Sequence, residues 1–154
     1  MDGTTLMGGG SELVPENGLA LSLHDAVSDL EQALAAPSET APDSWQDQIV
    51  QTVDRIRGRI REHASATEGH EGFHAEIRAA EPRLAHAVDQ LADEHVDLDE
   101  LLVQLREEAS ATQPADADHI RDLGYRVVSR FAKHVERGAS LMHEAFDRDL
   151  GGGD

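Results

Sequence analysis

Apolar residues recur every three or four positions along four separate segments of this chain. Because this spacing matches the period of an α-helix, each segment is expected to form an amphipathic helix with one buried stripe. Strand-like alternation and runs of β-branched residues do not occur, and aromatic residues make up only 3% of the chain. The sequence therefore predicts an all-α fold.

Glycine, proline and serine divide the chain into these segments. The four helices are expected at about 19–35, at about 44–80, from Pro82 to the loop at 112–116, and from Ala117 onward. The connecting loops are short enough to make neighbouring helices antiparallel, which predicts an up-down four-helix bundle. The expected organisation is a disordered Gly-rich leader, the bundle domain and a Gly-rich tail, at residues 1–18, 19–148 and 149–154.

The charge balance argues against several classes of partner. The chain carries 31 acidic and 13 basic residues, which gives a net charge of −18. Such a chain repels phosphate backbones and anionic lipids, so neither nucleic acid nor a membrane is expected as a partner. The N-terminal segment lacks the features of a signal peptide, and no apolar run is long enough to span a membrane. A cytoplasmic protein is therefore expected.

The absence of cysteine limits the chemistry further. It excludes disulfides, thiolate metal ligands and cysteine nucleophiles, so any metal site must use histidine and carboxylate. The sequence has no Gly-rich phosphate loop after a strand and no GxSxG motif. A hydrolase is not expected.

Histidines interrupt or extend the apolar stripes of the predicted helices. His95 fills the gap in the leucine ladder of the third segment, His63 continues the isoleucine stripe of the second, and His134 continues the seam of the fourth. In the first segment, His24 lies three residues before Val27 and beside the stripe. Each helix thus offers one histidine at or next to its buried seam.

Counting residues from the turns compares the heights of these histidines along the bundle, since each residue adds about 1.5 Å of rise. Counted from the Glu81 turn, His63 and His95 differ by roughly one turn, and Glu68 is level with His95. Counted from the last loop, His95 and His134 are level within a turn. A single inward histidine is more often a hydrogen-bonded core residue than a ligand. Several level ones each need a polar partner, and a shared cation would satisfy them together.

Four stretches around these histidines resemble the hemerythrin-like (HHE) family. They are LHDAVSDLEQAL, IRGRIREHASATEGHEGFHAEI, EPRLAHAVDQLADEHVDLDELL and VVSRFAKHVERGASLMHEAFD. Members of this family are four-helix bundles that hold a non-heme iron centre, usually two irons bridged by carboxylates and oxygen. They bind dioxygen, handle iron or respond to redox signals.

The resemblance implies a set of metal ligands. The implied imidazole ligands are His24, His63, His95 and His134. The implied bridging carboxylate is Glu68. Thr67 departs from the family pattern, because an acid is usual four residues after the second histidine, and Gly138 and Ala139 stand where the fourth helix should offer another acid. Asp99 could substitute from the third helix, or it could be a solvated flank. The site could then hold one iron, an asymmetric pair, or zinc or manganese.

Two further histidines lie near the end of the second predicted helix. His70 and His74 are four residues apart, and His74 is roughly level with His86 across the Glu81 turn. A second, peripheral metal site is therefore geometrically possible. The interpretation that we favour from the sequence is that both are exposed histidines at a helix end.

Two functions from different classes follow from these patterns. The first is a metal-binding protein that binds dioxygen, handles iron or senses redox state; if it is an enzyme at all, it is an oxygen-dependent non-heme iron oxidoreductase. The second is a metal-free helical bundle that acts as an interaction module, with its acidic faces docking a basic protein.

Overall fold

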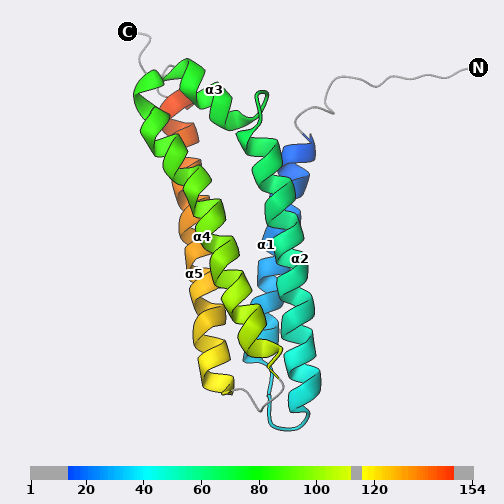
Figure 1. Ribbon diagram of the computed structural model, residues 1–154. Helices are drawn as coiled ribbons and strands as arrows, with labels where there is room; N and C mark the ends of the chain where they lie inside the picture. The colour runs from blue at the N-terminus through cyan, green and yellow to red at the C-terminus, as the bar shows by residue number, and fades with distance from the viewer. Residues whose placement is uncertain (1–13, 112–115, 148–154) are drawn as a thin grey trace, which may run out of the picture.

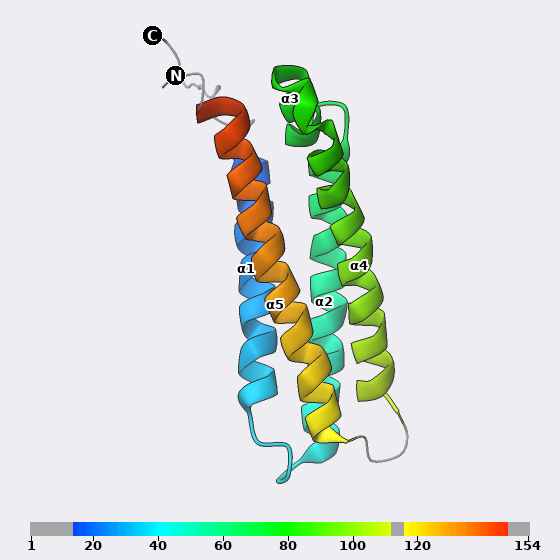
Figure 2. The same ribbon diagram turned by 90° about the vertical axis from the view of Figure 1, so that its left-hand side faces the viewer.

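The computed structural model describes residues 14–111 and 116–147. Its four long helices are α1 (Val14–Ala35), α2 (Pro42–Glu68), α4 (Ala85–Ala109) and α5 (Ala117–Met142). The shorter elements are α3 (Phe73–Ala80), a 3₁₀ turn (Pro82–Leu84) and a terminal π-helical turn (His143–Asp147). The long helices run side by side and alternate in direction (Figures 1 and 2), and the described residues contain no strand. The predicted all-α, antiparallel four-helix bundle is confirmed.

The helix boundaries differ from the expected ones at two places. Helix α1 begins at Val14 rather than near Leu19, so the last residues of the expected leader are helical. Helix α2 ends at Glu68 instead of continuing to about Ala80, and a turn separates it from α3. Residues 1–13 and 148–154, which hold the rest of the expected leader and the tail, lie outside the described residues. Within the described part of the chain, no helix is long and apolar enough to cross a membrane.

Gly72 allows the chain to fold back over the end of α2. A Cβ atom at this position would lie 2.3 Å from the carbonyl oxygen of Ala66 and 2.4 Å from that of Thr67. Real side chains do not approach backbone atoms so closely, so the turn requires glycine here. The turn directs α3 across the end of the bundle, between α2 and α4 (Figure 1). This reversal brings the histidine-rich segment after α2 back toward the core.

The hydrophobic core has a large part and a small part. The large part joins all four long helices and includes Leu30, Leu34, Ile49, Leu102 and Ile120, which are fully buried. The small part lies under α3 and consists of Ile77, Leu84, Val88 and Ala145. Along α4, His95 lies between Leu98 of the large part and Val88 of the small part. His95 is therefore placed where the two apolar clusters meet.

A substitution at Gly72 tests whether this turn positions α3. Gly72→Ala should lower the free energy of unfolding by about 1–3 kcal/mol, the usual cost of forcing extra atoms into a packed site. Urea unfolding followed by circular dichroism measures the change. Gly58→Ala is the matched control, because an added Cβ at Gly58 meets nothing within 4 Å. The control should raise stability by roughly 0.5–1 kcal/mol, since alanine is the better helix former. Equal stability of Gly72→Ala and the native chain would contradict this role for the turn.

Candidate metal centre

Three histidines from three helices meet inside the bundle. They are His63 of α2, His95 of α4 and His134 of α5, and one ring nitrogen of each lies within 4.8 Å of the other two. His95 and His134 are buried, and His63 is half-buried. The ring centroid of His63 is 5.2 Å from that of His95 and 6.0 Å from that of His134. This histidine cluster could hold a metal ion.

Two carboxylates fix the orientation of the buried rings. Glu68 Oε2 lies 2.5 Å from His95 Nδ1, and Glu94 Oε1 lies 2.7 Å from His134 Nδ1. An ionised carboxylate only accepts hydrogen bonds, so each Nδ1 carries the proton and donates it. The lone pair of each ring is then on Nε2. Metal-binding histidines are commonly held by carboxylates in this way.

The two Nε2 atoms face each other across the bundle. His95 Nε2 and His134 Nε2 are 3.1 Å apart. With both Nδ1 atoms protonated, two neutral rings would direct lone pairs at one another, and a cation between them removes that repulsion. Two nitrogens that each lie about 2.1 Å from one ion are separated by about 3.0 Å at a right angle and about 3.4 Å at a tetrahedral angle. The donor set and the separation of the Nε2 atoms therefore fit one transition metal ion.

Burial favours the neutral form of two rings of the cluster, those of His63 and His134. Burial, together with the smaller effects of the neighbouring His95 and His134, lowers the pKa of His63 to about 4. Burial also lowers the pKa of His134, although the hydrogen bond with Glu94 opposes the shift. Neutral imidazole is the form that binds metal ions. His63 and His134 are thus in their metal-binding form at neutral pH.

His74 of α3 is a further buried histidine, next to the cluster. Its side chain is only 1% exposed, and its ring lies parallel to that of His95 with centroids 6.1 Å apart. Burial lowers the pKa of His74 to about 4, and its Nδ1 has no hydrogen-bond partner among the described residues. The expectation that His70 and His74 are both exposed is wrong for His74, because the Gly72 turn folds α3 inward; His70 is exposed.

Of the other predicted ligands, two lie apart from the three-histidine cluster and Glu68 contacts it from outside. His24 is exposed on α1, with its ring 6.5 Å from that of Phe131. Asp99 accepts two hydrogen bonds from Arg57, at 2.8 and 3.3 Å, so its carboxylate is already occupied. Glu68 contacts Nδ1 of His95, on the opposite side of the ring from the other two histidines.

Glu94 belongs to the candidate site through its contact with His134 and was not predicted from the sequence. It directly precedes His95 in EPRLAHAVDQLADEHVDLDELL, one of the four stretches that carry the family resemblance. Glu94 contacts Nδ1 of His134 in α5, whereas the neighbouring His95 contacts Nε2 of the same ring. The other oxygen of Glu94 pairs with Arg137. Two helices are therefore linked through this one carboxylate.

A mostly apolar cavity of about 190 Å³ opens beside His63 and His134. Its walls come from α1, α3, α4 and α5, and include Leu23, Phe73, Leu91 and Phe131. Gly138 also lines it, and a Cβ atom there would meet nothing within 4 Å. The glycine that replaces an expected acid thus leaves open space next to the cluster.

The lowered pKa values predict how acid destabilises the metal-free protein. His63 and His74 titrate near 6.5 when unfolded and near 4 when folded, so the unfolded chain binds more protons between these values. The free energy of unfolding is therefore highest above about pH 6.5 and falls as the pH is lowered toward about 4. For a fully buried group, each unit of pKa shift corresponds to about 1.4 kcal/mol of this loss. Urea unfolding at several pH values, with chelator present, measures this loss. His74→Leu should show a shallower pH dependence, and an unchanged slope would contradict the assignment.

Comparison of the chain with protein-family models, with curated proteins and with solved structures gave no match. The resemblance to the hemerythrin-like family stays a prediction from the sequence. The four-helix bundle and the histidine cluster are properties of the structure itself.

Proposed function

We propose that this protein binds a transition metal ion inside the bundle through His63, His95 and His134. The main support is the pair of Nε2 atoms 3.1 Å apart, each on a ring whose Nδ1 is held by a carboxylate. This arrangement leaves both lone pairs directed at one point, where a cation satisfies them. Three imidazoles from three helices also restrict the ion to a single place in the bundle.

The donor set favours some metals over others. Imidazole suits iron, zinc, copper and nickel, whereas manganese and magnesium prefer oxygen ligands. We propose iron as the functional metal because of the resemblance to the hemerythrin-like family, with zinc as the main competitor and manganese less well matched. His74 is proposed as a further nitrogen ligand, since its Nδ1 is buried beside His95 and has no other partner among the described residues.

The apolar cavity supports a role in binding a small molecule. It opens directly beside His63 and His134, and its volume of about 190 Å³ suits a ligand of a few atoms. Apolar walls admit dioxygen or a similar uncharged molecule more readily than an ion. Iron, when bound, supplies affinity for dioxygen and the ability to exchange electrons. We therefore propose dioxygen binding, iron handling or redox sensing as the function.

Metal content of histidine variants tests this function. The untagged chain should bind about one iron ion, measured by elemental analysis after equilibration with ferrous iron and removal of the excess. His95→Ala and His134→Ala should each lose most of this metal, because each removes one of the facing nitrogens. His70→Ala and His24→Ala are the controls and should retain it, since both side chains are exposed.

Two results would contradict the proposal. One is a fully folded native chain that takes up neither iron nor zinc, which would favour the metal-free interaction module. The other is metal uptake that survives the combined His95→Ala and His134→Ala change, which would place the ion elsewhere.

A further inference from the structure

A row of basic side chains follows α5 beside the histidine cluster. Arg126, Arg130, Lys133 and Arg137 are exposed and occur at spacings of four, three and four residues, so they share one face of the helix. Arg137 pairs with Glu94. The other three make no ion pair with any residue in the described part of the chain.

Most arginines outside this row form ion pairs within the described part of the chain. The chain has 31 acidic residues, and arginines on other helices use them: Arg55 pairs with Asp29, and Arg106 pairs with Asp54. Like charges three and four residues apart on a helix repel each other. Repulsion within the row on α5 therefore lowers the stability of the fold, and no ion pair among the described residues offsets it at Arg126, Arg130 or Lys133. A bound anion would remove this repulsion.

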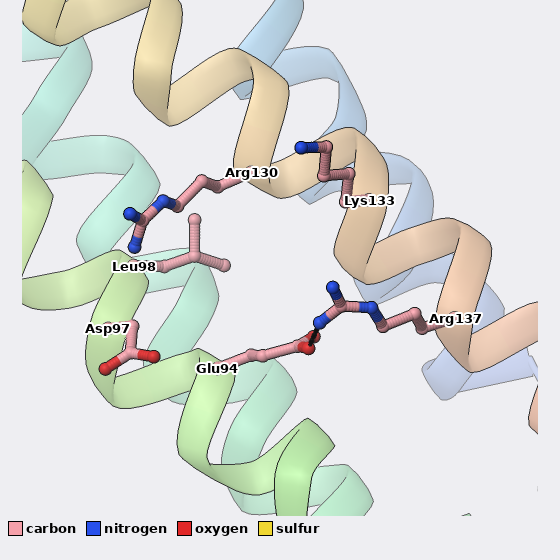
Figure 3. Close-up of a pocket in the computed structure, with 6 residues that line it drawn as sticks. All are labelled: Glu94, Asp97, Leu98, Arg130, Lys133 and Arg137. Carbon is pink, nitrogen blue, oxygen red and sulfur yellow. Dashed lines mark hydrogen bonds and ion pairs between the residues drawn. The ribbon is translucent and has the colours of Figure 1, made fainter. Parts of the chain in front are cut away.

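A pocket of about 230 Å³ lies between α4 and α5 at this row. It is lined by Glu94, Asp97, Leu98, Arg130, Lys133 and Arg137 (Figure 3). Arg130 and Arg137 extend from α5 toward α4, and Lys133 lies between them on the same helix. The one dashed contact among the residues drawn joins Arg137 to Glu94, and Glu94 also holds His134. The pocket thus has three cations, and one of its two carboxylates is shared with the histidine cluster.

We propose that this pocket binds a small oxyanion, a phosphate or carboxylate group, through Arg130, Lys133 and Arg137. A guanidinium group can donate two parallel hydrogen bonds to two oxygens of such an anion, and an ammonium group adds a compact positive charge. The net charge of −18 opposes this only weakly, because salt screens exposed charges beyond about 8 Å at physiological ionic strength. The binding of a small anion in the pocket therefore depends mainly on the cations that it contacts.

Glu94 connects this pocket to the proposed metal site, so the second part of the inference rests on the proposed function. One oxygen of Glu94 accepts the Nδ1–H of His134, and the other pairs with Arg137. An anion that binds Arg137 draws that guanidinium away from Glu94. The carboxylate then acts more strongly on His134 and makes its Nε2 a better metal ligand. Anion and metal should therefore strengthen each other's binding by the same factor.

Calorimetric titration of the full, metal-free chain tests the pocket directly. Inorganic phosphate and citrate are titrated separately at constant ionic strength, which distinguishes the phosphate from the carboxylate source. We expect saturable binding of at least one of them, weakened about tenfold or more in Arg130→Ala and in Lys133→Ala. Arg61→Ala, which removes an exposed arginine outside the pocket, should leave binding unchanged. Absence of saturable binding for both anions, or equal binding in all variants, would overturn the proposal.

A second titration tests the coupling. Metal affinity is measured with and without sulfate, which binds metal ions weakly, at constant ionic strength. Sulfate should tighten metal binding about fivefold or more, within the usual range of coupling between sites. Glu94→Gln should abolish this effect while the chain still binds the anion. Anion binding with unchanged metal affinity would overturn the coupling alone. A chain that binds anion but no metal would overturn the coupling and the proposed function, and leave the anion site intact.

Discussion

The contact between His95 and His134 is the constraint on which the rest of the interior depends. Their Nε2 atoms lie 3.1 Å apart, and each ring is tied at Nδ1 to a carboxylate. Buried polar groups are costly unless they are fully satisfied. A leucine in place of His95 would continue the apolar ladder of α4, so the sequence gives up packing at the centre of this helix. A cation bound between the two Nε2 atoms would explain why these polar rings lie in the interior.

The remaining features of the bundle support this site from different sides. The large apolar cluster holds the four long helices together below it, and α3 covers it at the other end with the small cluster. Glu68 and Glu94 lie at its edge, where they keep contact with solvent while orienting the inner rings. Glu94 also contacts Arg137, so a change at the surface of α5 can reach His134 through one carboxylate. The surface of α5 and the histidine cluster are thus physically connected.

Much of the fold and part of the site could be predicted from the sequence. The spacing of apolar residues predicted the four helices. The constant rise per residue of a helix predicted that His95 and His134 lie at one level. The burial of His74 could not be predicted, because it depends on a backbone reversal at Gly72 that no hydrophobic pattern reveals. The role of Glu94 was missed because only the packing of α4 on α5 shows which histidine it reaches.

X-ray absorption spectroscopy of the iron-loaded full chain tests the central claim most directly, because it reports the atoms bound to the ion. Three or more imidazoles should appear as a nitrogen shell at about 2.0–2.2 Å, together with the outer scattering of the histidine rings. The imidazole signal should weaken in His134→Ala. A spectrum dominated by oxygen ligands without imidazole scattering would contradict the claim that His63, His95 and His134 form the metal centre.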